Sequence, residues 1–212
     1  QATALIFKET PEVAEWRRQT NKFIKLGFAD ELKYQDPEKY RLTIPPFFCQ
    51  PRNWKEIYDY PVIVEERIPA KKRHQLMGVH EYINGDQITN LTSQRDFPQV
   101  YTTYMAGGSE LVIGTFEEAI RHTPRNGKAV TMAGVDSFYL RYSELFGDKN
   151  GKWRDAGESR YGAGYVPSRR VWDGMPEVSA DRVDDPRGSW RVLFCGNKIG
   201  TLNLGNFELL AV

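Results

Sequence analysis

The chain has 212 residues, of which 40% are hydrophobic and 13% aromatic, enough for one globular domain with a substantial core. Its 29 basic and 28 acidic residues nearly cancel, which argues against general binding to nucleic acid or to an anionic membrane. No apolar run reaches the roughly 18–20 residues that span a bilayer, so the sequence predicts no transmembrane segment. Cys49 and Cys195 are too few for a disulfide framework, and we expect two buried reduced thiols rather than one bridge.

The chain begins with Gln1 instead of methionine. We expect either that a targeting segment was removed upstream or that the sequence starts at an artificial boundary. A removed segment would place the protein in the mitochondrion or another organelle, with secretion as the second choice. The sequon Asn90-Leu91-Thr92 is compatible with secretion.

The N-terminal third predicts one amphipathic helix and then an extended stretch. Thr10 followed by Pro11 is typical of a helix start, because the hydroxyl caps free backbone N–H groups and proline suits the first turn. Apolar residues then recur at three- and four-residue spacing before Gly27 ends the helix. Four of these residues are expected to pack on the sheet that contains Leu193, Ile199 and Leu202: Val13, Trp16, Phe23 and Ile24. The proline- and phenylalanine-rich residues 42–54 favour an extended conformation.

The middle of the chain predicts four strands. Tyr60–Arg67 and Val100–Met105 have strand composition. Leu76–Ile83 and Gln87–Leu91 flank an Asn-Gly pair, which tolerates the positive φ of a tight turn, so they are expected to form a hairpin.

A short β-α-β-like unit follows. Leu111–Ile113 and Ala129–Ala133 are strand-like, and the helix between them begins with a capping box formed by Thr115 and Glu118. Asp136 is then expected to cap a further helix.

The fold predicted from these elements is a single α+β domain with a mostly antiparallel sheet. The C-terminal end forms a β-meander of three strands: Trp190–Cys195, Ile199–Leu204 and Phe207–Val212. Three long irregular excursions are expected to extend from the body: residues 1–8, 42–54 and 147–189. Within the last of them, residues 151–177 show neither a helical nor a strand period.

No motif in the chain carries a known catalytic chemistry. The sequence contains no nucleophile elbow, phosphate loop or complete dinucleotide fingerprint. The histidines occur in no dyad or metal pattern: His74, His80 and His122. The densest acidic cluster lacks EF-hand spacing and is expected to be a solvated turn: Asp181, Asp184 and Asp185. We therefore expect no catalytic residue, no metal site and no cofactor.

Residues 151–177 combine glycines, arginines and large aromatic residues. Over residues 147–190 eight acidic residues balance eight basic ones, which argues against a nucleic-acid tail, and the aromatic residues are too many for a disordered linker. Aromatic residues and arginine are enriched at protein interfaces. The segment is therefore predicted to bind partner chains through six residues: Trp153, Tyr161, Tyr165, Arg169, Arg170 and Trp172.

The function that these patterns favour is a non-catalytic accessory or structural subunit of a larger multi-protein assembly. The first alternative is an enzyme with a pocket for an anionic small substrate under residues 147–189. Four side chains are candidates for that pocket: His80, Tyr82, and Arg169 or Arg170.

The second alternative is an RNA-contacting subunit of a ribonucleoprotein. Its candidate contacts are the consecutive basic residues Lys71, Lys72 and Arg73, which are followed by His74, together with Arg169, Arg170 and the aromatic residues near them. Without any RNA contact, the same basic residues are expected to form a solvated loop between a proline and the next strand.

Overall fold

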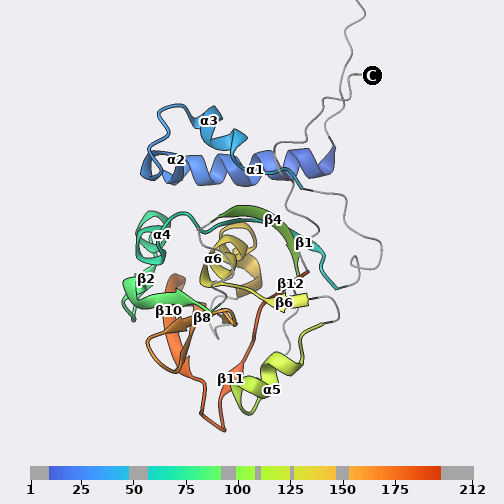
Figure 1. The fold of residues 1–212 in the computed structure, drawn as a ribbon, viewed down its shortest axis with the longest axis vertical. Coiled ribbons are helices and arrows are strands. Elements are labelled where there is room, and N and C mark those ends of the chain that lie inside the picture. The colour runs from blue at the N-terminus through green and yellow to red at the C-terminus, as the bar shows by residue number, and fades with distance from the viewer. Residues whose placement is uncertain are drawn as a thin grey trace, which may run out of the picture.

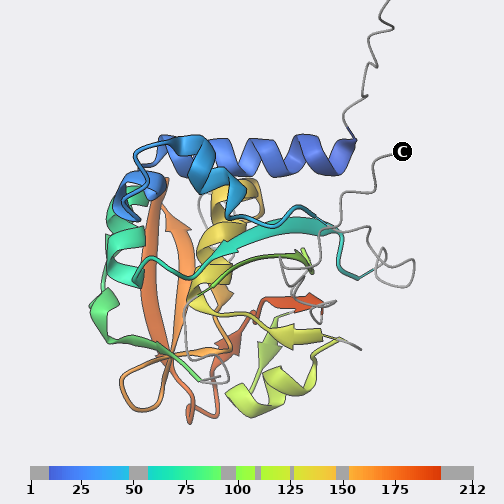
Figure 2. The same cartoon turned by 45° about the horizontal axis from the view of Figure 1, so that its top comes forward.

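The computed structural model describes six stretches of the chain: 10–47, 57–91, 99–107, 111–124, 127–146 and 153–196. In them, helices and mostly antiparallel strands form one α+β body (Figures 1 and 2), which confirms the expected class. Among these residues no helix combines the length and apolar character needed to cross a bilayer.

The first helix, α1 (Pro11–Lys25), begins as the sequence predicts. The Thr10 hydroxyl accepts a hydrogen bond from the backbone N–H of Val13 at 3.4 Å, and proline occupies the first turn. The helix ends at Leu26, and Gly27 follows with φ of +86°, a left-handed conformation that glycine adopts without a Cβ clash.

The apolar side of α1 packs on two short helices and one strand. Phe23 stacks on Phe28 at 4.9 Å between ring centroids, and both join a core cluster that includes Ile63. The helices α2 (Phe28–Glu31) and α3 (Pro37–Leu42) lie beside α1 at one end of the body (Figure 1). Helix α1 thus packs on the strand Tyr60–Glu65, which belongs to the same sheet as Phe194–Gly196; Ile199 and Leu202, which were also expected in this packing, lie outside the described residues.

The first sheet has four antiparallel strands in the order β1-β4-β12-β6. Their bounds are Tyr60–Glu65, Val100–Met105, Phe194–Gly196 and Gly127–Ala129. Helix α6 (Met132–Arg141) lies between this sheet and the second one (Figure 2), and its buried face forms the centre of the largest core cluster. A 3-10 turn, η3 (Ser143–Phe146), follows α6.

The second sheet has the strand order β2-β10-β9-β8-β3, with β7 also paired to β9. Its strands are β2 (His80–Glu81), β10 (Met175–Arg182), β9 (Tyr165–Trp172), β8 (Ser159–Tyr161), β3 (Ile88–Asn90) and β7 (Arg154–Asp155). The described part of the expected 147–189 excursion is thus folded into the body, with the β9–β10 hairpin at the centre of a sheet. The sequence shows no alternation of apolar and polar residues in β9, because polar residues of this strand, including Ser168 and Arg169, are buried.

The expected hairpin between residues 76 and 91 does not form. The basic run lies in helix α4 (Ala70–Met77), and the Asn-Gly pair begins a 3-10 turn, η2 (Gly85–Gln87), in which the Asn84 side chain accepts from Asp86 N at 3.1 Å. Strand β2 pairs parallel with β10, whereas β3 pairs antiparallel with β8. The Asn side chain stabilises the turn locally but does not bring the two flanking segments together.

The expected β-α-β unit has its helix but lacks the parallel pairing. The capping box of α5 (Phe116–Arg121) is confirmed, with Glu118 N donating to Thr115 Oγ1 at 3.3 Å and Thr115 N donating to Glu118 Oε2 at 2.7 Å. However, β5 (Val112–Ile113) pairs with β11 (Ser189–Trp190), whereas β6 belongs to the first sheet. The two strands therefore lie in different sheets.

Helix α6 begins earlier than the sequence suggested. Thr131 is its N-cap, and Asp136 lies within the helix and is 1% exposed. Strands β11 and β12 overlap the first strand of the expected meander, and its other two strands, 199–204 and 207–212, lie outside the described residues. The predictions for residues 1–8, residues 48–54 and Cys49 also fall outside them. Cys195 is buried in β12.

Candidate functional site

The pairing of three strands places aromatic and charged side chains together on the outer face of the second sheet. Arg170 of β9 is paired with Glu177 of β10, which is in turn paired with His80 of β2. Paired residues share a face and side chains alternate along a strand, so Trp172 and Met175 belong to the same side. We call this set the outer face: His80, Tyr82, Arg170, Trp172, Met175 and Glu177.

Contacts within the outer face hold its side chains in place. Glu177 accepts hydrogen bonds from Tyr82 Oη at 3.1 Å and from Arg170 Nε at 2.9 Å. The Arg170 guanidinium lies 5.7 Å from the ring centroids of both Tyr82 and Trp172, and His80 meets Tyr82 edge to face at 4.6 Å. Three of its apolar side chains still face solvent: Tyr82 is 59% exposed, Trp172 47% and Met175 56%.

A cleft of about 500 Å³ adjoins the outer face. Its floor includes Ser168 and Ser179, whose hydroxyl oxygens lie 3.2 Å apart across β9 and β10. The aromatic residues Trp153 and Tyr165 also line it, as do Asp185, Arg187, Gly188 and Ser189. Arg170 lines the cleft as well as the outer face, so the two are continuous.

The charged groups of the cleft are only partly neutralised by one another. Arg182 makes a bidentate ion pair with Asp184 at 3.0 and 2.7 Å. Asp185 accepts a hydrogen bond from the backbone of Arg187 at 2.9 Å. The side chain of Asp181 makes no hydrogen bond or ion pair with the residues that the structure describes. Burial raises its pKa, the charge of Arg170 opposes this, and the charge of Asp185 adds to the rise.

A second carboxyl lies beside the cleft, on a strand that pairs with β9. Asp155 of β7 is paired with Ser168, which lines the cleft, and its side chain is 0% exposed. One oxygen, Oδ2, accepts from the backbone N–H of Arg191 at 2.5 Å, and the carboxyl also interacts with the side-chain N–H of Trp153. Burial raises the pKa of Asp155 to about 7 against the opposing effect of that N–H, and the charge of Asp181 adds to the rise. Asp155 therefore exchanges a proton near neutral pH.

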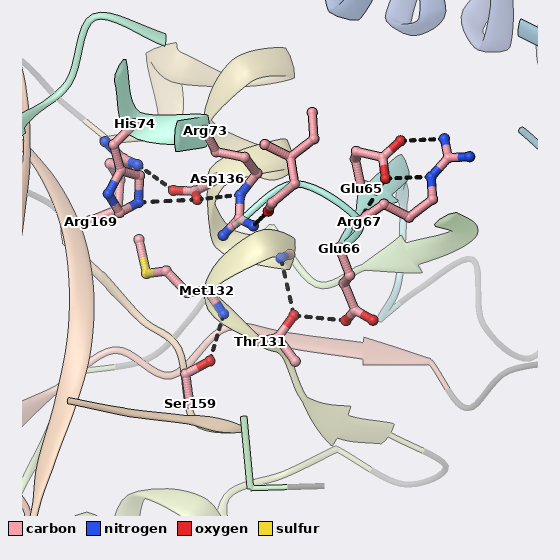
Figure 3. A network of polar contacts seen from close by, with 12 residues as sticks. Glu65, Glu66, Arg67, Arg73, His74, Thr131, Met132, Asp136, Ser159 and Arg169 are labelled. Atoms are coloured by element: carbon pink, nitrogen blue, oxygen red, sulfur yellow. Dashed lines mark hydrogen bonds and ion pairs between the residues drawn. The ribbon is translucent and has the colours of Figure 1, made fainter. Parts of the chain in front are cut away.

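A larger ionic cluster surrounds Asp136 on α6 (Figure 3). Its carboxylate pairs with Arg73 of α4 at 3.0 Å and with Arg169 of β9, and it lies 3.3 Å from His74 Nε2. His74 Nδ1 lies 2.5 Å from Oε1 of Glu81. Burial opposes ionisation of Asp136, but the charges of Arg169, His74 and Arg73 outweigh it and hold its pKa well below the usual range.

The Asp136 cluster connects elements of the core and is not a binding site on the surface. Arg73, Asp136 and Arg169 are at most 5% exposed, and they join α4, α6 and β9. The same view shows how the start of α6 is held: Ser159 accepts from Met132 N at 2.9 Å. Buried ionic groups of this kind are costly to break, because each charge that is left without a partner stays desolvated.

The structure separates the six residues that the sequence nominated as partner contacts. Trp153 and Tyr165 line the cleft, and Arg170 and Trp172 belong to the outer face. Tyr161 is half-buried on β8, with its ring 6.4 Å from that of Tyr165. Arg169 points to the opposite side of β9 and is buried against Asp136, so it is not available for contacts on the surface.

The residues proposed for the two alternative functions are also separated. His80, Tyr82 and Arg170 do meet on one face, as the enzyme hypothesis requires, but Arg169 does not. The basic run carries little free charge. Lys71 pairs with Asp86 at 2.7 Å, Lys72 pairs with Glu31 at 3.2 Å, and Arg73 is buried in the Asp136 cluster.

Sequence reasoning missed Asp155, Asp136 and Met175. Asp155 has only one local signal, its spacing of two residues from Trp153, which places both on one side of a strand. Among the described residues no group of three or more His, Cys, Asp or Glu side chains is arranged to hold a metal ion. No family model matches the chain, and neither the curated proteins nor the solved structures returned a match. The function is therefore argued from the site alone.

Proposed function

We propose that this protein is a non-catalytic subunit that binds a protein partner through the outer face of its second sheet. The observation that carries the proposal is the adjacency of Tyr82, Trp172 and Met175, three large apolar side chains that are each about half exposed on one side of a sheet. Aromatic residues, methionine and arginine are the residues enriched at the centres of protein interfaces.

The internal contacts of the outer face also favour binding. Tyr82 and Arg170 are held by Glu177 before any partner arrives, and Arg170 lies over both aromatic rings. Ordering a flexible side chain on association costs about 0.5–1.5 kcal/mol, so side chains that are already ordered retain more of their contact energy. The Arg170–Glu177 pair is neutral overall, which leaves the surface attractive to apolar groups.

A photo-crosslinking amino acid at position 172 tests the proposal. In extracts of the source cells we expect one discrete crosslinked partner, and we expect Tyr82→Ala in the same chain to reduce its yield severalfold. The matched control carries the crosslinker at Leu42, which is 77% exposed on α3 away from the outer face. Equal crosslinking from both positions, or a yield that Tyr82→Ala leaves unchanged, would contradict the proposal.

A second candidate function is an enzyme that acts on a small polar substrate in the cleft. It is favoured by the volume of about 500 Å³, since small-molecule sites commonly measure about 300–1,000 Å³. It is also favoured by Asp155, whose pKa of about 7 suits a proton donor or acceptor. Asp155→Asn distinguishes the candidates, because it removes a titrating group beside the cleft and leaves the outer face unaltered.

A further inference from the structure

A small pocket lies between α1 and the end of α6, where the two helices cross (Figure 2). It measures about 120 Å³, below the roughly 300–1,000 Å³ of sites for drug-sized molecules. Three basic residues line it and no acidic residue does: Arg18 and Lys22 of α1 and Arg141 of α6. The pocket shares no residue with the outer face or with the cleft, so it is a separate candidate site.

One carboxylate among the described residues makes contact with these three cations. Glu15 of α1 accepts from Arg141 Nε at 2.5 Å and from Nη2 at 3.1 Å, and it lies 3.7 Å from Arg18. Lys22 makes no ion pair within the described stretches and donates to a backbone carbonyl at the end of α6. The charge of Glu144 also reaches Lys22, but repulsion by Arg141 is stronger and, after burial, is the main reason why the pKa of Lys22 is lowered. Three positive charges against one contacting carboxylate leave an excess of two.

The basic groups are held in place and still have N–H donors for a ligand. The Lys22 ammonium has three donors and uses one of them on the α6 carbonyl. Arg141 binds Glu15 through Nε and Nη2, and its guanidinium lies 4.6 Å from the centroid of the Tyr142 ring. Its Nη1 group makes no hydrogen bond within the described part of the chain. The buried side chains of Phe23 and Leu140 complete the lining, and an apolar surrounding strengthens the attraction between opposite charges.

This arrangement favours a phosphate group over other small ligands. Three converging cations repel metal ions and organic cations. A phosphate group carries about 1.5–2 negative charges at neutral pH, close to the excess that remains after Glu15 is counted. Its oxygens can accept from an ammonium and from guanidinium groups at the same time. A carboxylate has one charge and two oxygens, so it satisfies fewer of these donors.

We infer that the pocket between α1 and α6 binds a phosphate group through Arg18, Lys22 and Arg141. The charges of the whole chain nearly cancel, so the affinity is local to this pocket and does not extend to polyanions in general. The site goes beyond the proposed function, because it uses neither Tyr82 nor Trp172 and lies on other elements.

Titration with inorganic phosphate tests the pocket directly. The backbone amide resonances of Ser137 and Leu140 report binding, since both residues line the pocket. The pH is fixed, and sodium chloride keeps the ionic strength constant, so that screening does not change during the titration. We expect a saturable shift with phosphate and a weaker one with acetate, which is the carboxylate control. N-acetyl-phosphoserine amide is titrated in the same way to show whether the phosphate group can be part of a larger molecule.

Three glutamine variants locate the charges that matter. Lys22→Gln and Arg18→Gln each remove one charge from the lining and should weaken phosphate binding about tenfold, the loss expected when a hydrogen bond to a charged group is removed. Lys25→Gln is the matched control, because Lys25 is exposed on the same helix but does not line the pocket, and it should change the affinity little. The Arg18 side chain is 67% exposed, so its replacement preserves the packing even if Lys22→Gln weakens the end of α6. Thermal unfolding without ligand confirms that each variant is folded.

The outcomes decide both the site and the source of the phosphate group. No saturable shift, equal shifts with acetate, or equal effects of Arg18→Gln and Lys25→Gln would overturn the phosphate site. Binding of inorganic phosphate and of the phosphoserine probe supports a site for a phosphate group carried by a larger ligand, whereas binding of inorganic phosphate alone supports a site for the free ion. Crosslinking at position 172 reads the outer face independently, so the proposed function can fail while the phosphate site stands.

Discussion

Replacing Asp155 with asparagine should remove a loss of stability that the protein suffers as pH rises. The carboxyl is buried, and its pKa is raised from 3.8 to about 7 by burial, with the charge of Asp181 contributing. Between these two values the folded chain holds a proton that the unfolded chain has released. Since the native state then binds more protons, the free energy of unfolding falls as pH increases from about 4 to about 7 and levels off above that.

The size of the effect follows from the shift. A rise of about 3 pKa units at about 1.4 kcal/mol per unit gives about 4 kcal/mol of stability lost between acid and mildly alkaline pH. Asparagine resembles the protonated acid in shape and charge, and its carbonyl oxygen can still accept the hydrogen bond from Arg191 N. The difference in stability between Asp155→Asn and the parent protein should therefore grow in favour of the variant by about 4 kcal/mol over this range.

Urea unfolding at a series of pH values measures this difference directly. Asp184→Asn is the control, because Asp184 is exposed and its pKa is lowered by Arg182, so its curve should run parallel to that of the parent above pH 5 or so. If the curves for Asp155→Asn and the parent protein are also parallel from about pH 4 to pH 8, Asp155 does not carry a raised pKa in the native state and the reasoning fails.

Three further substitutions test the core by urea unfolding. Asp136→Asn leaves Arg73 and Arg169 buried without their counter-charge and should lower the free energy of unfolding by about 3–5 kcal/mol; a loss below about 1 kcal/mol would mean that the cluster is solvated. Thr115→Ala removes the capping box of α5 and should cost about 1 kcal/mol, and an unchanged midpoint would contradict the cap. Gly157→Ala places a Cβ 2.6 Å from the nearest side-chain carbon and should cost about 1–3 kcal/mol; a more stable variant would show that the site has room.

How much of this fold can be predicted depends on how local each signal is. The start of α1 at Thr10 and the capping box of Thr115 and Glu118 were predicted correctly, because a side chain there satisfies backbone groups only three residues away. Strands β1 and β4 were predicted from composition within a few residues of their bounds. The α+β class followed from the order of such elements along the chain.

The β9–β10 hairpin was not predictable in this way. Arg169 is charged but completely buried, because it pairs with Asp136. Asp136 lies 33 residues earlier on another element, so the sequence near Arg169 does not indicate this burial. Asp136 was read as a helix cap for the same reason: one carboxylate suits a helix end or a buried ion pair, and the sequence does not distinguish them.

In the candidate site too, some features follow from local composition and others depend on contacts between distant strands. Aromatic residues and arginines at 153–172 nominated this part of the chain for partner contacts by composition alone, because such side chains are enriched at interfaces, and that nomination stays a prediction. Which of them face outward was decided by the register of β9 against β10, since a strand turns alternate side chains to opposite sides. The parallel pairing of β2 with β10 then brought His80, which is 90 residues before Arg170 in the sequence, onto the same face, and a contact over that separation is determined only when the sheet assembles.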